Sequence, residues 1–405
     1  MKLENLKDKK ILILGFGKEG KNTYKTLKKL FPKKPIAISD KNKVILEGEK
    51  IFFGEDYLKR ISEYDVIIKT PGISYDIIKP YLKKNNIVTS QTELFLENCP
   101  GMVIGITGTK GKSTTTKLIS HLLKTKGLKV KTVGNIGKPS LSYLLKAKPS
   151  DIFVYEMSCH QLDRLKKSPH IGVLLNLYEE HLDYYKTFKK YAKAKMNIAI
   201  HQEVNDFIIY NPKIEIKTKS HKIPFKKQKI KKEGFHEHTI SAAVAVAKIF
   251  GLTRKEIEAG IESFRGLDSR LEYLGSIKGV KLYNDSLSTI PEATIFALNQ
   301  LKDVDTLILG GKDRGINYDE LIKEIKKRKI KNIVLFPETG DRIFKKIKNE
   351  KINMLRTESM KEAAEFCLKN TKKICLLSPA ASSYNLFKNY KDRAKQFKKY
   401  LNVKK

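Results

Sequence analysis

Short apolar runs alternate with amphipathic stretches along the whole chain. The run "KILILGFG" (residues 10–17) is followed by "KEGKNTYKTLKKLF" (18–31), in which apolar positions recur at helical spacing, and then by a second apolar run, "KPIAISD" (34–40). Continuous apolar runs of this length are typical of strands buried on both faces, whereas the stretches between them are typical of surface helices. The pattern therefore predicts an α/β fold built on mainly parallel sheets.

The predicted strands fall into three blocks of unequal size. The second block opens with "MVIGITG" (102–108), and the third opens with "VKLYNDS" (280–286), after the turn "RGLDSR" (265–270). Domains usually span about 100–200 residues, so a chain of 405 residues is expected to hold two or three. We predict three α/β domains, at residues 1–92, 93–267 and 268–405.

The chain is strongly basic, with 81 Lys and Arg residues against 44 Asp and Glu residues and a formal charge of +37. Charge alone would suggest a nucleic-acid-binding protein. The lysines are scattered through the chain, however, as in residues 211–232, without interleaved aromatic residues or a recognisable nucleic-acid module. We therefore expect solvated faces and no specific nucleic-acid partner, with a positive field that attracts polyanionic nucleotides.

Cysteine usage and apolar run lengths indicate a cytoplasmic protein. The four cysteines, Cys99, Cys159, Cys367 and Cys375, have neither C-x-x-C spacing nor the regular spacing of a disulfide framework. The N-terminus lacks the features of a signal peptide. No apolar run approaches the roughly 18–20 residues that a membrane helix needs, so we expect no transmembrane segment.

A first glycine-rich loop, "GFGKEG" (15–20), directly follows a predicted strand and opens a predicted helix. Its glycines, Gly15, Gly17 and Gly20, are in G-x-G-x-x-G register. In this setting the unpaired N–H groups of the helix N-terminus favour a diphosphate. Asp40 ends the next strand, where an acid that binds ribose would lie. The ligand could be a dinucleotide or another nucleoside diphosphate, and a tight turn without a ligand is the alternative.

A second loop, "GITGTKGKST" (105–114), also joins a strand to a helix. Gly108 and Gly111 would let the backbone approach phosphate oxygens closely, and Lys112 would supply a positive charge for the β/γ end. Ser113 and Thr114 would offer hydroxyls to magnesium. Ile106 stands where the strict P-loop pattern has its first glycine. The departure argues against the common motor and switch classes, and the loop still predicts a nucleotide site.

Two further polar residues follow buried strands of the same block. Glu156 lies in "VYEMSCHQL" and His181 in "YEEHLDYY". The carboxyl ends of parallel strands meet at one sheet edge, so both could approach the phosphate loop. Magnesium prefers oxygen ligands but tolerates an imidazole beside phosphate oxygens. Taken alone, His181 would more often be an ordinary loop histidine.

Nine motifs follow one another along the chain: "GITGTKGKSTTT", "GNIGKPSL", "YEMSCHQLD", "NLYEEHLDYY", "YAKAKMNI", "GLDSRLE", "NDSLSTIPEAT", "LGGKDRG" and "LSPAASSYNLFKNY". In sequence and in order they resemble the motifs of the Mur ligases, ATP-dependent amide-forming enzymes of peptidoglycan synthesis. Together with "GFGKEG" and "TPGIS", they extend the resemblance over essentially the whole chain. It is strongest to the members that add D-glutamate to UDP-N-acetylmuramoyl-L-alanine. The resemblance implies a Rossmann-like first domain, a P-loop-type central ATPase domain and a Rossmann-like third domain.

The resemblance also implies a role for each motif. ATP phosphorylates the carboxylate of the UDP-linked substrate, and the amine of the incoming amino acid then attacks the acyl phosphate. The UDP moiety would lie near Gly15, Phe16, Gly17, Asp40, Thr70, Pro71 and Gly72, and the muramoyl-alanine part near Asn135, Ser158 and Gln161. ATP would be bound by Gly108, Thr109, Lys110, Gly111, Lys112, Ser113 and Thr114, with Arg270 and Asp285 of the third domain.

The remaining implied roles concern metal, catalysis and the amino acid. Two magnesium ions would be held by Ser113, Glu156, His181 and Lys195, the last as a carbamylated lysine that presents oxygen ligands. Lys112, His181 and Lys195 would be catalytic. D-glutamate would be bound by Arg314, Ser383, Tyr384 and Tyr390, since a guanidinium can bind a carboxylate through two hydrogen bonds. Because separate domains supply these groups, closure during turnover is expected.

Some positions depart from the family pattern. The His-Asn-x-x-Asn run appears as "HTISA", so Thr239 and Ala242 replace both asparagines and leave the adenine contacts open. Leu287 replaces the usual lysine after "NDS", and Arg393-Ala394 replaces a terminal "RG". Alternatives are a ligase that adds another amino acid or serves a peptidoglycan-like polymer, a nucleotide-binding module without catalysis, and a basic nucleic-acid-binding protein. We expect a monomer.

Overall fold

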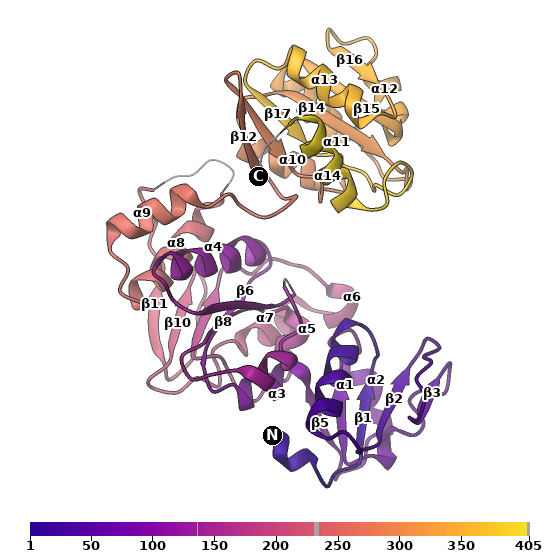
Figure 1. Cartoon of the computed structure of the whole chain (residues 1–405), viewed down its shortest axis with the longest axis vertical. Helices are drawn as coiled ribbons and strands as arrows, with labels where there is room; N and C mark the ends of the chain where they lie inside the picture. The colour runs from indigo at the N-terminus through magenta and orange to yellow at the C-terminus, as the bar shows by residue number, and fades with distance from the viewer. Residues whose placement is uncertain (136, 231–234, 403–405) are drawn as a thin grey trace. The chain divides into compact units, whose positions relative to one another are not determined.

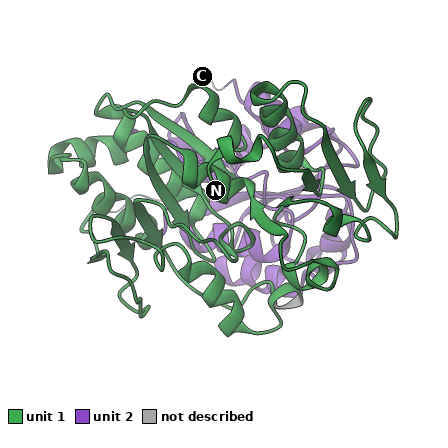
Figure 2. Ribbon diagram, turned by 90° about the horizontal axis from the view of Figure 1, so that it is seen from below, with its two compact units in different colours: residues 1–230, 237–261 green, residues 231–236, 262–405 purple. Residues whose placement is uncertain are grey.

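Three β-sheets with flanking helices make up the protein. The computed structural model describes residues 1–135, 137–230 and 235–402. The chain divides into two compact units, residues 1–230 with 237–261 and residues 231–236 with 262–405 (Figure 2). Unit 1 contains the first two sheets and unit 2 contains the third. The predicted α/β class with mainly parallel sheets is confirmed, and the boundaries at 92 and 267 stay a prediction.

The first sheet has five parallel strands in the order β3-β2-β1-β4-β5 (Figure 1). The strands are β1 (Ile11–Leu14), β2 (Ile36–Asp40), β3 (Ile51–Phe53), β4 (Val66–Lys69) and β5 (Ile87–Ser90), and the α-helices of this region are α1 (Lys18–Leu30), α2 (Tyr75–Ile78) and α3 (Gln91–Asn98). Along β1, Ile11 and Ile13 join one apolar cluster, and Leu12 and Leu14 join another. Alternation therefore buries both faces of the strand, as the apolar run predicts.

The second sheet has six parallel strands in the order β11-β10-β9-β6-β8-β7. The strands are β6 (Met102–Thr107), β7 (Val130–Gly134), β8 (Ile152–Glu156), β9 (Ile171–Leu174), β10 (Phe207–Tyr210) and β11 (His221–Pro224). The helices are α4 (Lys112–Thr125), α5 (Cys159–Leu162), α6 (Leu182–Tyr185), α7 (Phe188–Met196), α8 (Glu237–Ile249) and α9 (Arg254–Ser263). The predicted phosphate loop, with Gly108 and Gly111, lies between β6 and α4 at the carboxyl end of a central strand.

Helix α3 links the first two sheets, and the predicted boundary at residue 92 falls inside it. Its Phe95 ring packs edge-on against Phe153 and Tyr155 of β8, with centroids 5.2 and 5.6 Å apart. The Thr92 hydroxyl lies 3.0 Å from the Tyr155 hydroxyl. These contacts bind the first sheet's last helix to the core of the second sheet, which explains why both sheets belong to one unit.

The third sheet has the order β12-β13-β17-β14-β15-β16 and is parallel except for the β12–β13 pair. The strands are β12 (Glu272–Ile277), β13 (Val280–Asn284), β14 (Val304–Gly311), β15 (Asn332–Glu338), β16 (Asn353–Arg356) and β17 (Ile374–Leu377). The helices are α10 (Pro291–Gln300), α11 (Asp319–Arg328), α12 (Thr339–Ile347), α13 (Met360–Asn370) and α14 (Tyr390–Tyr400). Within the described residues, no helix is long and apolar enough to span a membrane.

Candidate active site

The phosphate loop of unit 1 has a backbone that only glycine adopts without strain at two points. Gly108 has φ +155° and Gly111 has φ +88°, and a Cβ on Gly108 would lie 2.9 Å from the Leu175 Cβ. Asn176 holds the loop from β9's carboxyl end, because it accepts the Lys110 N–H (2.8 Å) and donates to the Lys110 carbonyl (3.0 Å). The loop is thus fixed in shape by its own strand ends.

Two lysine amines meet at one carbonyl of this loop. The Lys112 Nζ donates to the carbonyls of Gly108 and Thr109 at 2.9 Å, and the Lys195 Nζ donates to the Gly108 carbonyl, also at 2.9 Å. Lys195 lies on α7 with only 1% of its surface exposed, and its amine sits over the Tyr191 ring. Burial, with the nearby Lys112 charge, lowers the pKa of Lys195 to about 8.

His181 lies beside the loop in a strained backbone conformation, with φ +57°. Its Nε2 is 3.7 Å from the Glu180 carboxylate, and its ring contacts the His160 ring edge-on at 5.0 Å. The His160 ring also packs against Tyr184, and its Nδ1 lies 3.6 Å from the Cys159 sulfur. The predicted catalytic histidine therefore lies beside one acidic side chain, Glu180, and one aromatic ring, that of His160.

Glu156 ends β8 and is buried, with 3% of its surface exposed. Its backbone carbonyl accepts the Asn135 N–H at 3.2 Å, so these two predicted site residues are neighbours. No group of three or more His, Cys, Asp or Glu side chains in the described ranges is arranged to hold a metal ion. Any metal here would need ligands from a substrate or from water in addition to the protein.

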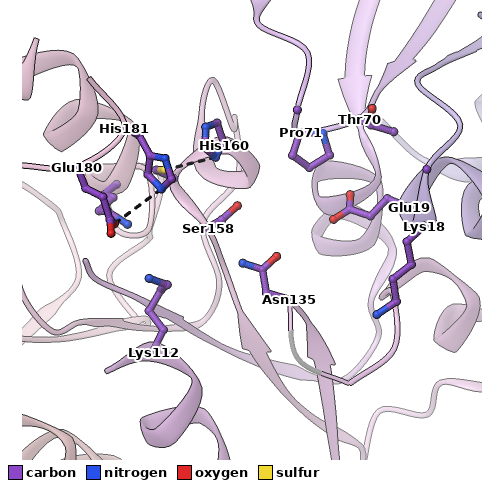
Figure 3. A pocket seen from close by; sticks show the side chains of 14 residues that line it. Lys18, Glu19, Thr70, Pro71, Lys112, Asn135, Ser158, His160, Glu180 and His181 are labelled. Carbon is purple, nitrogen blue, oxygen red and sulfur yellow. Dashed lines mark hydrogen bonds and ion pairs between the residues drawn. The ribbon is translucent and has the colours of Figure 1, made fainter. Parts of the chain in front are cut away.

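A cavity of about 530 Å³ in unit 1 joins the phosphate loop to the first sheet (Figure 3). Its lining includes nine of the predicted site residues: Gly17, Thr70, Pro71, Gly72, Lys112, Asn135, Ser158, His181 and Lys195. Five others line it and were missed by sequence reasoning: Lys18, Glu19, Cys159, His160 and Glu180. All five are immediate neighbours of predicted residues within the same motifs, so their position in those motifs was the available signal.

The first glycine loop lies at the edge of this cavity and is held by protein contacts. A Cβ on Gly15, which has φ +90°, would lie 2.0 Å from the Thr70 hydroxyl, so the close approach of these two loops requires glycine. The Phe16 N–H donates to the Asp40 carboxylate at 2.6 Å. Gly15, Phe16 and Asp40 do not contribute to the cavity lining.

Buried charges connect this loop to the central sheet. The Glu19 carboxylate accepts a 2.6 Å hydrogen bond from the Gln161 amide, and burial raises the pKa of Glu19. The Lys69 amine donates to the carbonyls of Thr70 and Ile73, and burial lowers its pKa to about 8. Lys69 thereby fixes the loop of Thr70, Pro71 and Gly72 from beneath.

The residues predicted to bind the amino acid lie in unit 2, and Arg314, Ser383 and Tyr384 follow the carboxyl ends of β14 and β17. β14 and β17 are parallel neighbours in the third sheet, so the loops that follow them begin at the same edge of the sheet. Lys312 N–H donates to the Ser382 carbonyl at 2.8 Å, which brings the loop of Arg314 beside that of Ser383. Arg314 and Tyr384 are exposed, whereas Ser383 is buried.

Tyr390 and Asp285 lie near the carboxyl end of β13. The Tyr390 carbonyl accepts a 3.0 Å hydrogen bond from the Ser286 hydroxyl. Asp285 follows β13 and is only 2% exposed, with its carboxylate bonded to three internal donors. Burial raises its pKa to about 6. Arg270, in contrast, is exposed in the turn before β12.

The chain is similar to known ligases in sequence and in fold. The Mur ligase middle domain matches residues 106–267. UDP-N-acetylmuramoylalanine–D-glutamate ligase of Caldanaerobacter subterraneus subsp. tengcongensis is 31% identical, over 97% of this chain and 98% of its own length. The enzyme of the same name from Streptococcus pyogenes serotype M49 is 33% identical, over 98% and 97% respectively.

Solved structures share the fold at lower identity. UDP-N-acetylmuramate-alanine ligase of Thermotoga maritima has a TM-score of 0.56 at 17% identity, over 98% of this chain and all of its own length. The MurF ligase of the same organism, solved in complex with ADP, has a TM-score of 0.54 at 18% identity, over 99% and 96%. The extent and identity of the sequence matches decide the family: the chain belongs to the Mur ligases, ATP-dependent amide-forming enzymes, among the UDP-N-acetylmuramoylalanine–D-glutamate ligases.

Proposed function

We propose that the chain joins D-glutamate to the carboxylate of UDP-N-acetylmuramoyl-L-alanine, with hydrolysis of ATP to ADP and phosphate. The observation that carries this proposal is a cavity in unit 1 that is lined both by Lys112 of the phosphate loop and by the loop of Thr70, Pro71 and Gly72. A γ-phosphate at Lys112 and a UDP-linked carboxylate that extends from the first sheet would therefore meet in this cavity. Phosphoryl transfer requires this proximity.

The ATP phosphates are placed at the loop between β6 and α4. Its glycines leave room for phosphate oxygens. The loop leads into α4, a helix of 14 residues, and the N–H groups at the N-terminus of a helix favour an anion. The Lys112 amine now bonds two loop carbonyls and would turn to the β/γ-phosphates when ATP binds. In this proposal Lys112 neutralises the charge that develops as the phosphoryl group moves.

Magnesium fits the donor set at this loop. The Ser113 hydroxyl, the buried Glu156 carboxylate and the His181 imidazole provide two hard oxygen donors and one nitrogen donor. Magnesium in nucleotide sites usually takes one or two protein carboxylates and completes its shell with phosphate oxygens and water. It would act as a Lewis acid on the phosphoryl oxygens. Such a site needs no cage of three acidic or imidazole side chains.

Lys195 is proposed to carry a carbamate. Its amine lies at the cavity wall with 1% of the residue exposed, beside the positive Lys112, and an added carboxylate would neutralise this pair of amines. The modification forms an N–C bond between the neutral amine and carbon dioxide, with release of one proton. The product would present oxygen atoms to a metal ion.

The UDP-linked substrate is placed across the first glycine loop and the loop of Thr70, Pro71 and Gly72. Asn135, Ser158 and Gln161 would contact its muramoyl-alanine part, and the first two line the cavity. Gln161 is held by Glu19 instead of lining the cavity. Gly15, Phe16 and Asp40 would contribute at the uridine end, where Asp40 already bonds the loop backbone.

In this proposal the amino acid binds beside the loops that follow β14 and β17 in unit 2. Exposed Arg314 would bind a carboxylate of D-glutamate through two hydrogen bonds, while Ser383, Tyr384 and Tyr390 would line the site. The γ-phosphoryl group of ATP passes to a carboxylate oxygen of the UDP-linked substrate, and ADP leaves. The amine then attacks the acyl carbon, the C–O bond to phosphate breaks, and the amine loses its proton as phosphate departs with that oxygen.

Release of phosphate in a panel of amino acids tests the proposal. With ATP, magnesium and UDP-N-acetylmuramoyl-L-alanine, we expect turnover with D-glutamate and at most background release with L-glutamate or L-alanine. Arg314→Lys keeps the charge but loses the paired hydrogen bonds, so it should raise the KM for D-glutamate while the KM for ATP stays unchanged. Turnover with L-alanine and none with D-glutamate would support the alternative of a Mur ligase that adds another amino acid.

A further inference from the structure

The loop after β14 places an acidic side chain directly beside the arginine predicted to bind the amino acid. Asp313 precedes Arg314 in the chain, and its carboxylate accepts the N–H groups of Gly315, at 3.1 Å, and of Arg314 itself. A carboxylate so close to a guanidinium is a ready ion-pair partner for it. Such a pair within the loop would occupy the N–H groups that a substrate carboxylate needs.

Arg342 of α12 binds this competing carboxylate. Its Nη1 donates to the Asp313 Oδ1 at 2.6 Å, and its guanidinium lies over the ring of the buried Tyr318, 5.5 Å from the centroid. Partial burial acts to raise the pKa of Asp313, but the hydrogen bonds from Arg342 and from the loop N–H groups outweigh burial and lower this pKa. Among the described residues, no ion pair joins the exposed Arg314 to an acidic side chain.

A second side chain at the start of α12 holds the same loop. Glu338 accepts the Asp313 N–H at 2.8 Å and also the Asp341 N–H, so its carboxylate is bonded to the backbone on both sides. Glu338 has φ +64°, a conformation that glutamate keeps only where its surroundings fix it. It follows an irregularity in which Pro337 is the extra residue of β15 opposite β14. Such bulges redirect side chains beside functional sites.

We propose that Arg342 is a positioning residue for the amino acid: by pairing with Asp313 it leaves the Arg314 guanidinium open to a carboxylate of D-glutamate. This inference rests on the proposed role of Arg314 in binding that carboxylate. Every residue of the arrangement belongs to unit 2. Without Arg342, the charged Asp313 carboxylate would turn to the nearest guanidinium, that of Arg314, and compete with the substrate.

A double variant separates this competition from a merely structural role. Arg342→Met should raise the KM for D-glutamate about 3–5-fold, the scale of one exposed ion pair, with the KM for ATP and for the UDP-linked substrate unchanged. Arg342→Lys keeps the charge and should restore most of the loss. Adding Asp313→Asn to Arg342→Met should return the KM for D-glutamate to within about 2-fold of wild type, because no charged competitor is left.

Arg356→Met is the matched control. Arg356 also pairs with an acidic side chain of α12, Asp341, at 2.5 Å, and both members of this pair are exposed. Its loss should leave the KM for D-glutamate unchanged, because Asp341 does not precede the binding arginine. The Arg342 and Asp313 side chains are likewise partly exposed, at 42% and 31%, so both variants should fold with similar, small changes in melting temperature.

The outcomes separate this inference from the proposed function. If Arg314→Ala raises the KM for D-glutamate but Arg342→Met does not, the positioning role is wrong. If the KM stays raised in the double variant, competition by Asp313 is not the cause, and the positioning role is again wrong. If Arg314→Ala leaves the KM for D-glutamate unchanged, the proposed role of Arg314 itself fails and the inference falls with it.

Discussion

Replacement of Lys195 by methionine should stabilise the protein while it abolishes the reaction. Lys195 is 1% exposed, and its pKa is lowered from 10.5 to about 8, chiefly by burial and then by the Lys112 charge. Each pH unit between these values corresponds to about 1.36 kcal/mol, so keeping the ammonium charged at pH 7 costs about 3 kcal/mol of folding free energy. Methionine has a similar shape and no charge, and the Gly108 carbonyl keeps its bond to Lys112.

The sign of the pH dependence follows from the lowered pKa. Between pH 8 and 10.5 the unfolded chain binds more protons at Lys195 than the folded chain, so wild-type stability gains from this group as pH rises. Below pH 8 the cost is constant. The advantage of Lys195→Met should therefore be about 3 kcal/mol at pH 7 and should fall to about 1 kcal/mol or less by pH 10.

Urea unfolding in buffers free of carbon dioxide measures this difference. The chain has no tryptophan, so far-ultraviolet circular dichroism is the suitable signal, with the two units fitted as separate transitions. Lys193→Met on the same helix is the matched control, because Lys193 is exposed and its loss should change stability by less than about 0.5 kcal/mol. Equal stabilities of wild type and Lys195→Met at pH 7, or a difference that is independent of pH, would refute the reasoning.

Three further predictions concern the cavity. Lys112→Ala should lower kcat at least about 100-fold with an unchanged circular dichroism spectrum, and retained turnover would contradict its phosphate role. Gly108→Ala should raise the KM for ATP and lower the melting temperature, because its Cβ would lie 2.9 Å from the Leu175 Cβ. Gly127→Ala is the control, since Gly127 also has a positive φ but no neighbour within 4 Å of such a Cβ. Equal falls in melting temperature for the two variants would argue against the contact with Leu175. Glu19→Ala should raise the KM for the UDP-linked substrate several-fold, because Gln161 loses its 2.6 Å partner, and a change in the KM for ATP alone would contradict this.

Local pattern predicted the fold class because each strand is a short apolar run buried on both faces. Local pattern also located the two glycine loops, because glycine is needed where the backbone lies close to another segment or takes a positive φ. Gly15 meets the first condition beside Thr70, and Gly111 meets the second with φ +88°. Lys195 could not be singled out by pattern in a chain with so many lysines. The family resemblance supplied it, and the structure adds its burial.

Other features depend on contacts between distant residues and leave little trace in local sequence. Asp285 reads as an exposed polar residue after a strand, yet hydroxyls from residues 3 and 93 positions away bury its carboxylate. The left-handed turn at Ser269 and Leu271 has no glycine to mark it. Helix α3 spans the predicted boundary because Phe95 packs into the next sheet, a contact that polarity along the chain does not reveal.

Oxygen-18 transfer tests the central claim most directly. UDP-N-acetylmuramoyl-L-alanine labelled in its alanine carboxylate is incubated with ATP, magnesium and D-glutamate, and the released phosphate is measured by mass spectrometry. Activation through an acyl phosphate predicts that each released phosphate carries one labelled oxygen atom from that carboxylate. Unlabelled phosphate, released at the same rate as the amide product forms, would contradict carboxylate activation in this cavity.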